Sequence, residues 1–273
     1  MVRLFDNFDI KLRNLNILNK NHLTGLYTIV RREIIRILRI WTQTLLPPAI
    51  TTTLYFIIFG SLIGRQIAPI ENFTYMQYIT PGLIMMAVIN NAYSNVVSTF
   101  FGAKFQRHIE ELLISPLPNF YILTGYVLGG VVRGLLVGAI VTVIALFFSK
   151  IHITHVFLMF YVLLITAVLF SLAGFINGIY AKNFDQTSIV PVFFLTPLTY
   201  LGGVFFSISM LPYYGQKIAM INPIFYNINA FRYSFLGLAE SNVYGSLIVL
   251  SLATLVLYLV ALNLLNKGVG IRT

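Results

Sequence analysis

Long apolar stretches separated by short polar breaks dominate the pattern of this chain. Six of them approach the roughly 20 residues with which an α-helix crosses about 30 Å of hydrocarbon. The pattern therefore predicts an all-α membrane protein with six transmembrane helices. Their expected ranges are 41–63, with a kink at its Pro47-Pro48 pair, then 78–102, 122–148, 156–180, 186–207 and 244–265.

A segment with a different period precedes the first stretch. Between residues 23 and 41, apolar side chains recur every three or four positions, while Arg32, Arg36 and Arg39 fall on the other side. This spacing predicts an amphipathic helix with an arginine-rich face. Such a helix lies in the membrane interface and pairs its cations with anionic lipid head groups. The alternative is a surface helix of a soluble domain, which the adjoining apolar stretch disfavours.

The segment 208–243 is moderately apolar but too interrupted for a clean span. It contains helix-breaking residues at Pro212, Gly215, Pro223 and Gly237. Irregular backbone at membrane depth is tolerated only against protein or water. We therefore expect short interfacial or re-entrant helices here, on the outer side and before the last span.

The distribution of positive charge predicts the orientation. If the N-terminus lies inside, the inner segments hold thirteen Lys and Arg residues and the outer segments hold four. Cytoplasmic loops carry the excess of such residues, so both termini are predicted to be cytoplasmic. The expected organisation is a cytoplasmic N-terminal segment with the amphipathic helix (1–40), a six-span domain (41–265) and a cytoplasmic tail (266–273).

Composition supports the membrane assignment. Hydrophobic residues make up 58% of the chain and charged residues 10%, with a mean hydropathy of +0.85, whereas soluble domains carry about 25% charged residues. The formal charge of +10 would suggest nucleic acid in a soluble protein. Here the basic residues cluster at span boundaries, so no nucleic-acid partner is expected. The chain has no cysteine, which excludes disulfides and thiolate metal sites.

Signals for catalysis are weak. The sequence has no GxxxxGK[ST] phosphate loop, no GxSxG and no HExxH motif. We expect this chain to have no catalytic, cofactor or metal site of its own. Two other classes stay open as alternatives. A secondary transporter would need acidic residues within the spans, and a membrane-embedded transferase or hydrolase would need convergent His, Asp or Glu side chains.

Arg133 is an anomaly because it lies well inside the third apolar stretch, among Gly129, Gly130, Gly134 and Gly138. A central arginine costs about 2.5–3.5 kcal/mol even on lenient insertion scales. We expect its side chain to face the bundle or a water-filled cavity and to have a partner. A role in the transport pathway or its gating, a structural pairing, and snorkelling all remain open.

The inner loop 104–118 joins two predicted spans and can form a short helix that Pro116 stops. Its polar and apolar residues resemble the corresponding loop of ABC-2 type permeases, the membrane subunits of ATP-driven exporters. The matching positions are Glu111, Leu112, Leu113, Ser115 and Pro116. A longer resemblance covers the fifth span and the loop after it, at Leu195, Leu198, Leu201, Gly202, Val204, Leu211, Pro212, Pro223, Ile224, Tyr226 and Arg232.

This resemblance implies a pore of two permease copies with two cytoplasmic ATPase subunits, in a bacterial cytoplasmic (inner) membrane. ATP and Mg would bind to those subunits and not to this chain. Family substrates include drugs, lipids and polysaccharides, moved outward. The inner loop would couple the permease to the ATPase, through Arg107, Glu110, Glu111, Leu112, Leu113, Ser115 and Pro116.

The resemblance also assigns residues to the outer segment. Gly202 and Gly203 would allow close helix contact, and Pro212 and Pro223 would mark turns; Tyr226 belongs to the same signature. Arg232 lies in a predicted outer segment, although the positive-inside rule places most Lys and Arg residues in the inner segments. It either anchors the segment by bonding exposed carbonyl groups or binds lipid head groups.

Overall fold

The computed structural model describes residues 22–64, 66–67, 69–70, 73–150 and 153–270. Within these residues the chain forms helices and loops, with one isolated bridge between Ile70 and Phe73. The predicted all-α class is confirmed. The first 21 residues of the N-terminal segment and the last three of the tail lie outside the described residues.

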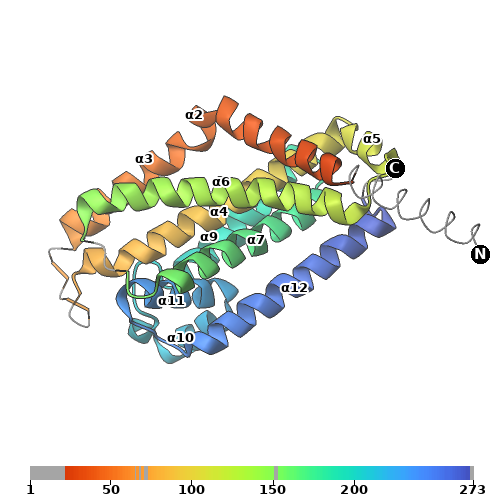
Figure 1. Cartoon of the computed structure of the whole chain (residues 1–273). Coiled ribbons are helices and arrows are strands. Elements are labelled where there is room, and N and C mark those ends of the chain that lie inside the picture. Colours follow the sequence, from red (N-terminus) through yellow and green to blue (C-terminus); the bar gives the residue numbers. More distant parts are fainter. Residues whose placement is uncertain (1–21, 65, 68, 71–72, 151–152, 271–273) are drawn as a thin grey trace, which may run out of the picture.

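Four long helices form the body of the bundle (Figure 1). They are α4 (Tyr75–Phe105), α6 (Asn119–Phe148), α7 (Val156–Tyr180) and α12 (Val243–Lys267). The helix α4 packs against both α6 and α7. It begins with a capping box, in which Thr74 and Gln77 satisfy each other's backbone N–H groups.

Within the described residues, three helices are long and apolar enough to cross a membrane, namely α6, α7 and α12. With 31 residues, α4 is longer, but polar side chains such as Asn90, Asn91 and Asn95 make it less apolar. The count of six spans stays a prediction.

The first predicted span is divided. The helix α2 (Trp41–Thr44) ends before α3 (Leu46–Tyr55), and the π-helix η1 (Phe56–Ile63) continues from α3. Both prolines of the Pro47-Pro48 pair lie in the first turn of α3, where a missing N–H leaves no helical bond broken. The expected kink is thus a break between two helices.

The fifth predicted span is divided as well. It comprises α8 (Phe184–Val190), the π-helix η2 (Pro191–Leu195) and α9 (Thr196–Leu201), so the helix ends six residues before the predicted limit. Gly203 follows with a φ of 85°, a left-handed conformation that glycine adopts without steric cost.

Glycines bring the central helices close together. A Cβ atom on Gly130 of α6 would lie 2.9 Å from the carbonyl oxygen of Ala92 in α4. One on Gly174 of α7 would lie 2.5 Å from the carbonyl oxygen of Tyr93. Small residues at such contacts let helix backbones approach each other, as in other membrane bundles.

Shorter helices lie at the two ends of the bundle. The helix α5 (His108–Ile114) lies near the end of α12 and the first described residues, whereas α10 (Tyr213–Ile221) and α11 (Pro223–Leu236) lie at the opposite end (Figure 1). A 3-10 turn, η3 (Ile208–Met210), precedes α10. Segment 208–243 therefore contains short helices, as its interrupted pattern predicts, and α11 is largely buried.

Candidate functional site

The inner loop forms a sharp turn and a short helix between α4 and α6. Arg107 occupies the turn with a φ of 62°, which is uncommon for a residue other than glycine. The helix α5 ends at Ser115, whose backbone is extended because a following proline disfavours the helical conformation. The Ser115 hydroxyl donates to the carbonyl oxygen of Leu112 at 2.6 Å. Pro116 therefore lies where the sequence places the end of the helix.

The two carboxylates of α5 are exposed, and its apolar residues divide into two sets. Ile109 is buried, and Leu112 and Leu113 pack partly against the protein's own core. Ile114, by contrast, is 84% exposed. The sequence interpretation gave the outward apolar contact to the leucines and missed Ile114. A helical projection separates them, because Ile109, Leu112 and Leu113 share one face at spacings of three and four.

Arg133 pairs with a neutral side chain inside the protein. Its Nη2 donates to Oδ1 of Asn91 in α4 at 3.2 Å. Both residues line a cavity of about 280 Å³, together with Asn90 and with Pro48 and Thr51 of α3. Arg133 thus faces the bundle and a cavity, with a partner, as its cost in the membrane leads us to expect.

The N-terminal helix, described over residues 22–39, buries one face that includes a carboxylate. Ile29, Glu33 and Ile37 form this face, and Glu33 is only 2% exposed. Arg36 donates to Glu33 at 3.3 Å and to Oδ1 of Asn95 in α4 at 2.5 Å. The predicted arginine face toward lipid head groups is therefore wrong for Arg36, whose side chain bonds within the protein.

Glu33 is a residue that the sequence interpretation missed. Space for it comes from Gly129 of α6, where a Cβ atom would lie 2.8 Å from the Glu33 side chain. Arg32 lies 3.6 Å from the carboxylate and donates to the Tyr126 hydroxyl at 3.0 Å. The available signal was that Glu33 is the single acidic residue between positions 22 and 41.

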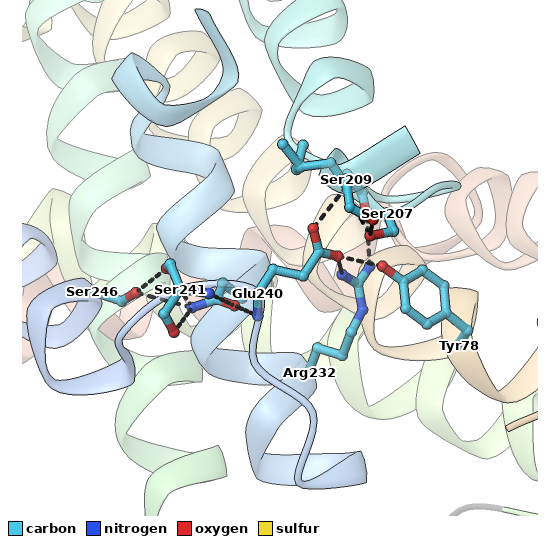
Figure 2. Close-up of polar contacts among 10 residues, drawn as sticks. Tyr78, Ser207, Ser209, Arg232, Glu240, Ser241 and Ser246 are labelled. Atoms are coloured by element: carbon cyan, nitrogen blue, oxygen red, sulfur yellow. Dashed lines mark hydrogen bonds and ion pairs between the residues drawn. The ribbon is translucent and has the colours of Figure 1, made fainter. Parts of the chain in front are cut away.

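A second polar group holds the outer segment together (Figure 2). Arg232 of α11 is 2% exposed and forms an ion pair with Glu240, with 3.0 Å between Nη1 and Oε1. Its Nη2 donates to the Gly203 carbonyl oxygen, and its guanidinium lies 4.0 Å from the centre of the Tyr78 ring. Two interpretations were left open for Arg232, namely bonding to carbonyl groups and binding to lipid head groups. The structure supports the first, because Arg232 bonds the Gly203 carbonyl oxygen.

Glu240 is the centre of this network, and the sequence interpretation did not single it out. Its carboxylate accepts hydrogen bonds from the Tyr78 hydroxyl and, at 2.7 Å, from the backbone N–H of Ile208. Its own N–H donates to Oδ1 of Asn229, also at 2.7 Å. The network therefore connects α4, the loop after α9 through Gly203, η3 through Ile208, and α11.

The remaining signature residues lie around the same segment. Gly202 ends α9, and a Cβ atom there would lie 3.1 Å from Ile224 of α11. Pro212 precedes α10, Pro223 is the first residue of α11, and the Tyr226 hydroxyl donates to the Met220 carbonyl oxygen at 2.7 Å. The prolines thus mark helix starts at the turns.

Comparison with known proteins identifies a family and relatives for this chain. Residues 24–236 match the family described as ABC-2 type transporter. The chain is 54% identical over 249 residues to the inner membrane transport permease YadH of Escherichia coli K12, covering 91% of this chain and 97% of that protein. It is 24% identical over 215 residues to nodulation protein J of Rhizobium leguminosarum bv. viciae, covering 78% of this chain and 83% of the relative.

Proposed function

This chain belongs to the ABC-2 type transporter family, and from that premise we propose that it is the membrane subunit of an ATP-driven exporter. It lies in the bacterial inner membrane, as the name of its YadH relative states for that protein. Two copies form the pathway, and two cytoplasmic ATPase subunits bind ATP and Mg. The cargo is a drug, lipid or polysaccharide, moved outward.

The exposure of α5 is the observation that carries this proposal. It presents the carboxylates of Glu110 and Glu111 and the apolar side chain of Ile114 on the outside of the bundle. Because α5 connects directly to α4 and α6, a partner that moves it acts on two helices of the body. Charges at the rim of such a contact set register and specificity more than affinity, while Ile114 supplies apolar area.

The orientation belongs to the same proposal. The first described residues, the end of α12 and α5 lie at one end of the bundle (Figure 1), which we assign to the cytoplasm from the excess of Lys and Arg in those segments. The helices α10 and α11 then lie on the outer side. Every ATPase contact is thereby assigned to the α5 end.

Charge reversal at Glu111 tests the coupling role. The protein is co-expressed with a cytoplasmic ABC ATPase that co-purifies with the wild-type permease, and the complex is purified through a tag on the permease. We expect Glu111→Lys to keep normal abundance in the membrane, because its side chain lies outside the bundle. ATPase recovery should fall, or hydrolysis should become independent of the permease.

The matched control is Asp185→Lys, an equal change of charge at an exposed residue in the first turn of α8. It should leave both ATPase recovery and permease-dependent hydrolysis unchanged. If Glu111→Lys behaves like this control, α5 does not make the coupling contact. If the purified permease hydrolyses ATP without a partner, the proposed function itself is wrong.

A further inference from the structure

We propose that this protein binds an oxyanion, of the phosphate type, at a group of four side chains between the N-terminal helix, α4 and α6. The group comprises Arg36 of the N-terminal helix, Asn91 and Asn95 of α4, and Arg133 of α6, and we call it the arginine–asparagine group. As a binding site it stands on its own geometry. That the anion is the head group of a transported molecule rests on the proposed function.

Several hydrogen-bond donors of this group have no acceptor. Both asparagine Oδ1 atoms accept from arginines, at 2.5 Å for Asn95 and 3.2 Å for Asn91. Three further buried nitrogens have no acceptor, namely Nε of Arg36, Nδ2 of Asn95 and Nε of Arg133. Asn95 is fully buried. A buried donor without an acceptor is destabilising, and more so when it is charged, so the group favours an acceptor with several oxygens.

The charges of the group are also unbalanced. Glu33 lies within ion-pair distance of Arg32 and Arg36, whereas no described carboxylate forms an ion pair with Arg133. Arg36 and Arg133 bond to Asn95 and Asn91, which lie one turn apart on α4, so their two positive charges lie near each other and repel. An anion between them would convert this repulsion into two attractions. Guanidinium groups suit this role because their planar fork matches the oxygens of a phosphate.

Cavities reach the group from two directions. One of about 720 Å³ lies between the N-terminal helix and α4 and is lined by Glu33 and Arg36, with Arg31 and Arg39 also on its wall. The cavity of about 280 Å³ described above touches Asn91 and Arg133. Arg36 therefore faces the larger cavity and Arg133 the smaller one, so each guanidinium group is open to an anion from a cavity.

The decisive variant is Asn95→Asp. It keeps the shape of the side chain but replaces the unpaired Nδ2 donor with an acceptor and adds a negative charge beside Arg36. If the group is built for an anion, this carboxylate occupies the place of the ligand. We expect Asn95→Asp to melt at a temperature no lower than wild type and to bind the anion about tenfold or more weakly, the effect of losing about 1.4 kcal/mol.

Binding is measured on the purified full-length permease in detergent, by the fluorescence of Trp41, the single tryptophan, five residues after Arg36. The probes are inorganic phosphate, short-chain phosphatidic acid, and diacylglycerol with the same chains as an uncharged control. Binding of phosphate alone as tightly as phosphatidic acid identifies a free anion as the ligand. Tighter binding of phosphatidic acid, with none of diacylglycerol, identifies an anionic amphiphile.

Three further variants complete the test. Arg133→Gln should weaken binding like Asn95→Asp, and Lys150→Gln, an equal loss of charge at an exposed loop residue, should not. Glu111→Lys should bind normally, which separates this site from the coupling contact. The proposal is overturned if neither anion binds, if Asn95→Asp binds like wild type, or if that variant melts lower, since its donors would then already be satisfied.

Discussion

Removing Arg232 should be among the most damaging single substitutions in the outer segment. Arg232→Met has similar length and apolar character but no charge or donor. It removes the ion pair to Glu240 and the hydrogen bond to the Gly203 carbonyl oxygen, and it uncovers the face of the Tyr78 ring. The carboxylate of Glu240, whose side chain is 18% exposed, then has no counter-charge.

The magnitude follows from this burial. Breaking a buried ion pair by removing one partner costs about 3–5 kcal/mol, because the other charge stays buried. At about 2–4 °C per kcal/mol for a chain of this size, the melting temperature should fall by roughly 6–20 °C. Lys217→Met is the control, since Lys217 is an exposed cation of α10 whose Nζ lies 4.5 Å from the ring centre of Tyr213. It should shift melting by no more than about 2 °C.

Circular dichroism of the purified variants in one detergent measures the melting temperatures. The double variant Arg232→Met/Glu240→Gln should be more stable than the sum of the two single losses predicts, because it leaves no unpaired charge. Equal melting of wild type and Arg232→Met would refute the reasoning. So would strict additivity in the double variant, because the ion pair would then make no contribution of its own.

Two other predictions concern topology and packing. Reporters that are active only outside the cytoplasm should be active when fused at positions 70, 152 and 240 and inactive at 112 and 270; activity at 112 would contradict the orientation assigned here. Gly174→Ala should lower the melting temperature, because its Cβ atom would lie 2.5 Å from the Tyr93 carbonyl oxygen. The control is Gly102→Ala, because no other atom lies within 4 Å of the position of its Cβ atom. It should leave the stability unchanged or raise it by up to about 1 kcal/mol. Equal losses in the two variants would argue against the close contact between α4 and α7.

Apolar runs and their polar breaks were enough to predict the all-α class, the helical loop before Pro116 and the short helices of the outer segment. These features depend on local pattern and on proline and glycine chemistry. Arg133 was also predictable in part, because the cost of a central charge requires a partner wherever that partner lies. Its identity as Asn91 depends on the contact between α4 and α6, which no local pattern specifies.

The roles of Glu33 and Glu240 could not be predicted from the sequence. Each is an ordinary carboxylate in the sequence, and each becomes important because distant residues surround it. Glu33 fits beside α6 because Gly129 leaves room, and Glu240 accepts a hydrogen bond from Tyr78, 162 positions away. A carboxylate that follows an arginine on an amphipathic helix, as Glu33 does, or that lies in a loop, as Glu240 does, is normally expected to be solvated. Only the packing distinguishes these two.

The helix α4 connects the proposed coupling helix α5 to the network around Glu240. At one end α4 leads through Arg107 into α5, and near the other Tyr78 donates to Glu240. Its 31 residues span roughly 46 Å at about 1.5 Å each. Pro81 cannot donate to the carbonyl oxygen of Gln77, so the first turns can tilt relative to the rest. Such a tilt must displace the loop after α9, because a Cβ atom on Gly82 would lie only 2.7 Å from the Val204 carbonyl oxygen. A movement of α5 can therefore reach the outer segment through α4 alone.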